Sequence, residues 1–248
     1  MIRAERRESV AWVILDRPER RNAITRSMID ELDAAIEEAL SDGECRCLVL
    51  SGAGGHFSAG RDLAGSTPAT DLPGYLERDD AWTGLFKRLA GARKATVAVV
   101  EGYAVAGGFT LAMACDFVVA EHEAKFGALE MRNRFPAAIN TPLLGKIAGP
   151  RLGLELAMTG SIFSAQRLYG GGLINHIAQG ADALAALAKE FTTHLASLDP
   201  EAVAMTKELH RAALTMPLGN ALDMGKLANT LLAASGRIAE AERRYSRK

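Results

Sequence analysis

Short apolar runs alternate with helical periodicity through the first half of the chain, and this alternation constrains the fold more than any other feature. Each run is rich in aliphatic and β-branched residues, as buried strands are. The four clearest runs are residues 10–15, 47–51, 96–100 and 116–120. Between the first two, apolar residues recur every four positions over residues 26–40, which predicts an amphipathic helix capped by Thr25.

The chain after residue 136 has mainly helical periodicity. Residues 62–80 contain Pro68 and Pro73 and are predicted to form a loop, with a helix near residues 81–90 after it. Strands and helices in alternation, followed by helices alone, predict an α/β fold with a core over residues 1–190 and a helical C-terminal region over residues 191–248. The helices expected after residue 136 lie near residues 137–147, 151–158, 164–169, 181–197, 200–213 and 217–243.

Composition limits the classes of function. The 248 residues carry a formal net charge of −1, which gives no field for attracting nucleic acid or an anionic membrane surface. Residues 1–8 are charged, and no apolar stretch approaches the ~20 residues that span a bilayer. We therefore expect no nucleic-acid partner, no membrane partner and a cytoplasmic location.

The three cysteines, Cys45, Cys47 and Cys115, are odd in number and too few for a disulfide framework. They suit a reducing compartment. No second pair of cysteine or histidine residues stands at a usual zinc spacing from Cys45 and Cys47. We expect buried, unpaired thiols and no metal site.

Two glycine-containing turns follow predicted strands. One spans residues 57–63 (FSAGRDL) and the other residues 105–110 (VAGGFT), which opens a predicted helix. Such turns leave backbone N–H groups unpaired, and the helix N-terminus adds positive potential. They can therefore bind a phosphate or an oxyanion through the main chain alone. Taken singly, each turn is better explained by tight packing between strand and helix, which glycine also allows.

Three other motifs are incomplete. Gly52-Ala-Gly54 follows a strand, but Phe57 stands where a dinucleotide fingerprint has its third glycine. A nucleophile elbow around Ser58 would need a small residue where His56 stands. Thr110 has no base beside it in the sequence. These patterns give no Rossmann, esterase-type or threonine-nucleophile assignment.

Five segments together are similar to the enoyl-CoA hydratase/isomerase (crotonase) family. Each segment alone is a weak signal, but all five keep the order and spacing of the family over nearly the whole chain. They are residues 16–23 (DRPERRNA), 57–63 (FSAGRDL), 102–116 (GYAVAGGFTLAMACD), 124–130 (AKFGALE) and 159–175, which holds TGSIFSA and GLIN. The resemblance implies a crotonase-like spiral of ββα units with a C-terminal helical trimerisation region, and a homotrimer or hexamer.

The resemblance also assigns roles to residues. The backbone N–H groups of Arg61 and Gly107 match the two donors that grip the thioester oxygen as it gains negative charge. The Arg61 side chain is either a solvated bystander or a contact to a CoA phosphate. No cofactor is implied, because coenzyme A is part of the acyl-CoA substrate. The residues that match the CoA-contacting positions of the family are Arg20, Arg21, Ala23, Ala59 and Asp62.

The family's hydratases use two glutamates, and the matching positions here hold Thr110 and Glu130. A threonine hydroxyl can orient water but cannot hold a negative charge near neutral pH. Glu130 alone could move a proton from one carbon to another, as single-glutamate isomerases of the family do. Feruloyl-CoA hydratase-lyases likewise have a hydroxyl residue at the Thr110 position. We expect enoyl-CoA hydration because it is the prevailing activity of the family that these segments resemble. The residues themselves lean toward double-bond isomerisation, which stays an alternative together with hydratase-lyase chemistry.

Two rival hypotheses belong to other classes. The chain could be an acyl-CoA-binding protein without turnover, or a hydrolase that uses Ser58 as nucleophile.

Asp62 is expected to cap the helix after the first glycine turn, and Asp116 to tie the start of a strand. The acyl group is not defined, although three phenylalanines are candidates for its pocket: Phe86, Phe109 and Phe135.

Overall fold

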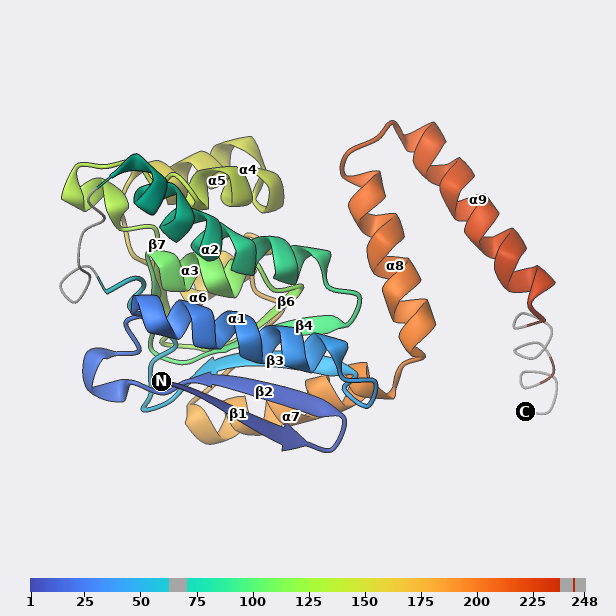
Figure 1. Cartoon of the computed structure of the whole chain (residues 1–248), viewed down its shortest axis with the longest axis horizontal. Helices are drawn as coiled ribbons and strands as arrows, with labels where there is room; N and C mark the ends of the chain where they lie inside the picture. Colours follow the sequence, from blue (N-terminus) through green and yellow to red (C-terminus); the bar gives the residue numbers. More distant parts are fainter. Residues whose placement is uncertain (63–70, 237–242, 244–248) are drawn as a thin grey trace. The chain divides into compact units, whose positions relative to one another are not determined.

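The computed structural model describes residues 1–62, 71–236 and 243 (Figure 1). The chain divides into two compact units, Met1–Ser197 and Leu198–Lys248. Residue 190, the predicted end of the core, lies within the last helix of the first unit, α7 (Ala181–Ser197). All strands of the described residues belong to the first unit, and the second unit is helical. The predicted combination of an α/β core with C-terminal helices is confirmed.

The main sheet has six strands in the order β1-β2-β3-β4-β6-β9. β1 and β2 form an antiparallel hairpin at the N-terminus, and all other neighbours in this sheet are parallel. β4 is buried at every residue, as expected for a parallel strand covered on both faces. The strands are β1 Ile2–Arg7, β2 Val10–Leu15, β3 Cys47–Gly52, β4 Ala95–Val100, β6 Phe117–Glu121 and β9 His176–Ala178.

Helices cover both faces of this sheet. α1 (Arg26–Ser41) buries Leu32 and Ile36 in the core with Leu50 of β3, and Thr25 caps it as predicted. α7 packs against the opposite face. Successive strand residues point to opposite faces, so one parallel strand contributes to both layers.

A second, three-stranded sheet positions the segments that hold Gly107 and Glu130. Its order is β5-β7-β8, with β5 Tyr103–Val105, β7 Lys125–Gly127 and β8 Phe163–Ser164. α3 (Gly107–Met113) follows β5 after one residue and is buried at every position. The segment after β7 forms a short 3-10 helix, Glu130–Asn133. The second sheet therefore places the start of α3 and Glu130 close together.

The predicted loop over residues 62–80 is wrong for its described C-terminal part. Residues 63–70 lie outside the described residues, but α2 begins at Leu72 and runs as Leu72–Gly91. Asp71 caps this helix by accepting a hydrogen bond from the N–H of Gly74. The prediction that Asp62 caps it is therefore wrong. Asp116 does tie a strand start, as predicted, since its carboxylate accepts from both the N–H and the hydroxyl of Thr96 at 2.8 Å.

The remaining helices follow the predicted pattern, with the predicted bounds at residues 200–213 and shifted ends elsewhere. Helices in the first unit are α4 Asn140–Ile147, α5 Gly149–Met158 and α6 Ala165–Gly170. The second unit contains α8 Pro200–Ala213 and α9 Leu218–Ala234, and residues 237–242 of the longer predicted helix lie outside the described residues. No helix among the described residues is long and apolar enough to cross a membrane.

Candidate active site

The extended segment that carries Arg61 explains why its N–H is available. Arg61 forms a parallel bridge with Ile24. Gly60 O accepts from Ile24 N at 2.8 Å, and Asp62 N donates to Ile24 O at 2.9 Å. Successive N–H groups of an extended segment point to opposite sides, so the N–H of Arg61 points away from Ile24. Within the described residues it donates to no other group.

The second main-chain donor is the N–H of Gly107 at the start of α3. The first N–H groups of a helix have no intrahelical acceptor, and that of Gly107 finds none elsewhere in the described part of the chain. A Cβ built on Gly60 would lie 2.8 Å from the Gly107 nitrogen, and a Cβ built on Gly107 would lie 3.4 Å from the Arg61 nitrogen. The two nitrogens are therefore close neighbours.

Ala106, just before Gly107, has an unusual backbone conformation. Its φ is 48° and its ψ is −124°, a combination that favours glycine. Such strain costs of order 1–3 kcal/mol and persists where the surroundings fix it. Here the Ala106 N–H donates to Gly127 O at 2.7 Å, and its carbonyl accepts from Phe109 and Thr110. The strained turn directs the Gly107 N–H outward.

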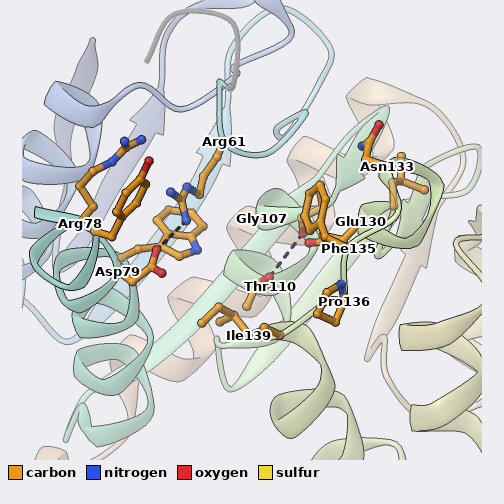
Figure 2. A pocket seen from close by; sticks show the side chains of 15 residues that line it. Arg61, Arg78, Asp79, Gly107, Thr110, Glu130, Asn133, Phe135, Pro136 and Ile139 are labelled. Atoms are coloured by element: carbon orange, nitrogen blue, oxygen red, sulfur yellow. Dashed lines mark hydrogen bonds and ion pairs between the residues drawn. The ribbon is translucent and has the colours of Figure 1, made fainter. Parts of the chain in front are cut away.

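These donors border a cavity of about 380 Å³ (Figure 2). Arg61, Gly107, Thr110 and Glu130 all line it, so the structure brings together the four residues predicted to act in catalysis. Its walls differ in character. The α2 side is polar and aromatic, with Tyr75, Arg78, Asp79 and Trp82. The opposite side has the apolar residues Phe135, Pro136 and Ile139, and Leu129 and Ala138 also line the cavity.

The Glu130 carboxylate has two oxygens in different situations. Oε1 accepts a hydrogen bond from Nδ2 of Asn140 at 3.0 Å. Oε2 is buried and has no hydrogen-bond partner within the described part of the chain. A buried oxygen without a partner is costly and calls for an explanation. An oxygen kept for proton exchange with a ligand in the cavity provides one.

Thr110 reaches Glu130 only through Asn140. Its hydroxyl lies 2.8 Å from Oδ1 of Asn140 and 3.4 Å from the carbonyl oxygen of Ala106. Both Thr110 and Asn140 are buried, each at 1% exposure. Asn140 is a functional candidate that the sequence did not single out. An asparagine at the start of a helix is an ordinary feature, so no local pattern marks it.

The Arg61 side chain forms an ion pair with a residue of α2. Its Nη1 lies 3.0 Å from Oδ1 of Asp79, and its guanidinium lies 6.0 Å from the Trp82 ring. Figure 2 shows this pair on the α2 side of the cavity. The arginine therefore helps to fix α2 against the segment that carries the Arg61 N–H.

The five predicted CoA-contacting residues gather around one short turn. Arg20 and Arg21 are exposed at the 3-10 helix Pro18–Arg20 and its end. Ala59 N donates to Arg21 O at 2.9 Å, which joins this turn to the first glycine turn. Ala23 and Asp62 lie beside it, and both are hydrogen-bonded by Arg17. The arrangement places two exposed arginines on the turn whose main chain is bonded to Ala59, and the Arg21 guanidinium lies 5.5 Å from the Tyr103 ring.

The geometry does not support the hypothesis of a hydrolase that uses Ser58 as nucleophile. Ser58 is fully buried; its hydroxyl donates to Asn22 O at 2.8 Å and accepts from Gly60 N at 3.1 Å. It therefore stabilises the turn. Of the three candidate phenylalanines, Phe135 lines the cavity, whereas Phe86 and Phe109 belong to the core.

The cysteines are buried and take part in no disulfide among the described residues, as predicted. They are Cys45, Cys47 and Cys115. Among the described residues, no group of three or more histidine, cysteine, aspartate or glutamate side chains could hold a metal ion.

The fold and the cavity define an α/β protein in which two unpaired main-chain donors and one carboxylate border a single pocket. The family described as enoyl-CoA hydratase/isomerase matches residues 5–245. The chain therefore belongs to this family and is an enzyme of it. Its predicted crotonase-like fold and family membership are both confirmed.

Individual relatives agree with this assignment. A Thermus thermophilus protein provisionally named an enoyl-CoA hydratase is 36% identical over 241 residues, which cover 96% of this chain and 95% of its own. The 1,2-epoxyphenylacetyl-CoA isomerase of Escherichia coli is 32% identical over 223 residues, or 88% of this chain and 84% of its own. The solved enoyl-CoA hydratase subunit I of Geobacillus kaustophilus has a TM-score of 0.90 at 31% identity and covers 100% of this chain and 95% of its own.

Proposed function

We propose that the protein hydrates the double bond of a 2-enoyl-CoA thioester through an enolate. The observation that carries the proposal is the convergence of the Arg61 N–H, the Gly107 N–H and the Glu130 carboxylate on one cavity. Hydration is also the activity most often named among the relatives. A conjugated thioester would use all three groups, because its oxygen gains negative charge and its carbons exchange a proton with a base.

The two N–H groups would donate to the thioester oxygen. As hydroxide adds to the β-carbon, the electron pair of the double bond moves toward that oxygen, and donors aimed at the new charge lower the barrier. One such donor is worth about 10²–10³ in rate in comparable sites. Both belong to the main chain, which explains why an arginine can stand at position 61.

Glu130 would serve both proton transfers. Oε2 takes a proton from water as the water oxygen bonds to the β-carbon, and the resulting carboxylic acid then delivers a proton to the α-carbon as the enolate collapses. Atoms and charge balance with one carboxylate, which ends in its starting state. The absence of a second carboxylate at position 110 is compatible with this sequence of steps.

Double-bond isomerisation is the second candidate, and the Thr110 hydroxyl favours it. Its hydrogen bond to Asn140 Oδ1 leaves Thr110 no proton to donate to a water in the cavity. In an isomerase, Glu130 would remove a proton from one carbon of a 3-enoyl-CoA and return it to another through the same enolate. Water would take no part.

The proposal also covers the binding of coenzyme A, the assembly of the protein and its location. Coenzyme A would lie against Arg20, Arg21, Ala23, Ala59 and Asp62, and no cofactor beyond this substrate is needed. Assembly into a homotrimer or hexamer is supported by α9, where large apolar residues stay exposed within the helix's own unit: Leu218, Leu222, Leu227 and Leu231. The free thiols support a reducing compartment such as the cytoplasm.

The test offers the purified protein a 2-enoyl-CoA and, separately, the matching 3-enoyl-CoA, and follows the ultraviolet absorbance of the conjugated thioester. Loss of absorbance from the 2-enoyl compound, with a 3-hydroxyacyl-CoA product, supports hydration. A gain of absorbance from the 3-enoyl compound alone replaces hydration by isomerisation. If both compounds bind without turnover, the binding-protein reading replaces both.

A further inference from the structure

The Glu130 carboxylate accepts a hydrogen bond from a side chain that does not line the cavity. Asn140, the first residue of α4, is buried at 1% exposure and is absent from the cavity lining. Its Nδ2 lies 3.0 Å from Oε1 of Glu130 and 3.4 Å from the carbonyl oxygen of Ala106. One amide group therefore joins the carboxylate to the turn just before Gly107.

Chemistry fixes the orientation of the Asn140 amide. An ionised carboxylate only accepts hydrogen bonds, so the NH₂ side of the amide must face Glu130. Oδ1 then faces Thr110, which can donate its hydroxyl proton at 2.8 Å. A flipped amide would place Oδ1 against the carboxylate and leave two acceptors in contact, at a cost that burial increases.

This arrangement gives each group one task. Thr110 orients the amide, the amide holds Oε1, and Oε2 of Glu130 stays without a partner in the described residues. The bond to the Ala106 carbonyl ties the same amide to the turn that directs the Gly107 N–H. The Asn140 amide therefore fixes both the Glu130 carboxylate and the turn that carries the Gly107 N–H.

We propose that Asn140 is the positioning residue of this active site: its amide, oriented by Thr110, sets Glu130 relative to the Gly107 N–H and reserves Oε2 for proton transfer. This inference rests on the proposed function and names a residue that acts in it without contacting substrate. Thr110 is then a positioning residue too, one step further from the reacting atoms.

The kinetic test compares four single variants and one double variant with wild type on the better of the two enoyl-CoA isomers. Asn140→Leu keeps the number and branching of the side-chain heavy atoms but removes the amide, and we expect kcat to fall about 10- to 100-fold, the range for losing a hydrogen bond to a charged group. KM should change less than about twofold, since Asn140 is outside the cavity lining. Thr110→Val should lower kcat about 3- to 10-fold, and Thr110→Ser should retain it, because serine keeps the hydroxyl.

A double variant separates positioning from general packing. If Thr110 acts through Asn140, adding Thr110→Val to Asn140→Leu causes no further loss. Thr141→Val is the matched control: Thr141 is exposed on the same helix, its hydroxyl donates to the Ala137 carbonyl, and kcat should be unchanged. Additive losses, or a rise in KM with kcat intact, would overturn the proposal. If Asn140→Leu does not fold, the Thr110→Val and Thr110→Ser pair decides: equal kcat values overturn it.

A second readout does not depend on turnover. In ¹⁵N-asparagine-labelled protein, the Asn140 side-chain amide signals, identified by their loss in Asn140→Leu or Asn140→Ser, should move in Glu130→Gln and in Thr110→Val but not in Thr141→Val. Absence of enoyl-CoA turnover in the wild type refutes the proposed function alone. If the Asn140 amide signals do not move in Glu130→Gln, the positioning role is refuted, whatever the activity.

Discussion

Nη1 of Arg17 lies 2.6 Å from Oδ2 of Asp62 and also donates to Ala23 O at 3.0 Å. Both side chains of the ion pair are largely buried, at 18% and 11% exposure. Asp62 directly follows Arg61, and its N–H bonds Ile24. The guanidinium therefore joins the N-terminal turn to the segment that presents the Arg61 N–H.

Replacing this guanidinium should loosen that segment. We expect Arg17→Gln to lower the free energy of unfolding by about 1–3 kcal/mol, since it leaves the Asp62 carboxylate without its charged partner in a partly buried position. kcat/KM should fall as well. Urea unfolding and steady-state kinetics measure the two effects. Arg3→Gln is the control, because the Arg3 side chain is 50% exposed and surface ion pairs contribute little.

Glu130→Gln removes the proton-transferring carboxylate while keeping its shape. We expect kcat to fall by about 10²–10⁴, the usual contribution of a positioned acid–base group, with acyl-CoA binding retained. Rapid-mix kinetics and calorimetry with a non-reactive acyl-CoA measure the two quantities. Glu190→Gln, at an exposed position of α7, should leave both unchanged. Full activity in Glu130→Gln would exclude Glu130 as the base.

Arg21 tests the proposed position of coenzyme A. Arg21→Gln should raise KM for an acyl-CoA about twofold to fivefold, as expected for an exposed charge pair, with little change in kcat. The effect should diminish in high salt. Thioesters of N-acetylcysteamine lack the nucleotide and its phosphates, so their KM should not respond to the substitution. An equal response of both thioester types would place the phosphates elsewhere.

Asp42 gives a pH-dependent contribution to stability. A hydrogen bond from the Glu44 N–H and an ion pair with Arg6 lower the pKa of Asp42 from its ordinary value of 3.8. A lowered pKa stabilises the fold above that ordinary value, and the contribution is lost as the pH falls through the lowered pKa. Asp42→Asn should therefore be less stable than wild type at neutral pH, and the difference should shrink in acid. Parallel pH–stability curves for the two proteins would contradict this.

The sequence predicted the main-chain donors because glycine turns after strands are local features. Gly60 and Gly107 lie within short motifs, and the N–H groups beside them need no particular side chain. The same reasoning misread Pro73. Proline is tolerated in the first turn of a helix, and here it follows the Asp71 cap at the start of α2. Two prolines in a polar segment suggested a loop where one of them marks a helix start.

The contacts of Asn140 could not be predicted from the sequence. Its partner Thr110 is 30 residues away in the chain, and its partner Glu130 is 10 residues away. Nothing in residues 137–147 distinguishes a buried asparagine that holds a carboxylate from one that faces water. Only the fold, which places α4 beside α3, brings the three side chains together.

The close approach of Gly60 to Gly107 gives the sharpest test of the paired donors. Gly60 has a φ of +89°, which strains any residue with a side chain, and a Cβ there would lie 2.8 Å from Gly107 N and 2.9 Å from Val105 O. Gly60→Ala must therefore push the two turns apart. Because donors aimed at the oxyanion act through exact placement, we expect kcat/KM to fall about 10²-fold.

Gly84 provides the matched control for this substitution. It lies within α2, and a Cβ there meets no atom within 4 Å. Gly84→Ala should leave kcat/KM unchanged and raise the free energy of unfolding by about 0.5–1 kcal/mol, since alanine is the better helix former. Kinetics and thermal unfolding of both variants measure the contrast. If Gly60→Ala folds and keeps full activity, the separation of the Arg61 and Gly107 N–H groups is not critical, and the paired-donor mechanism fails.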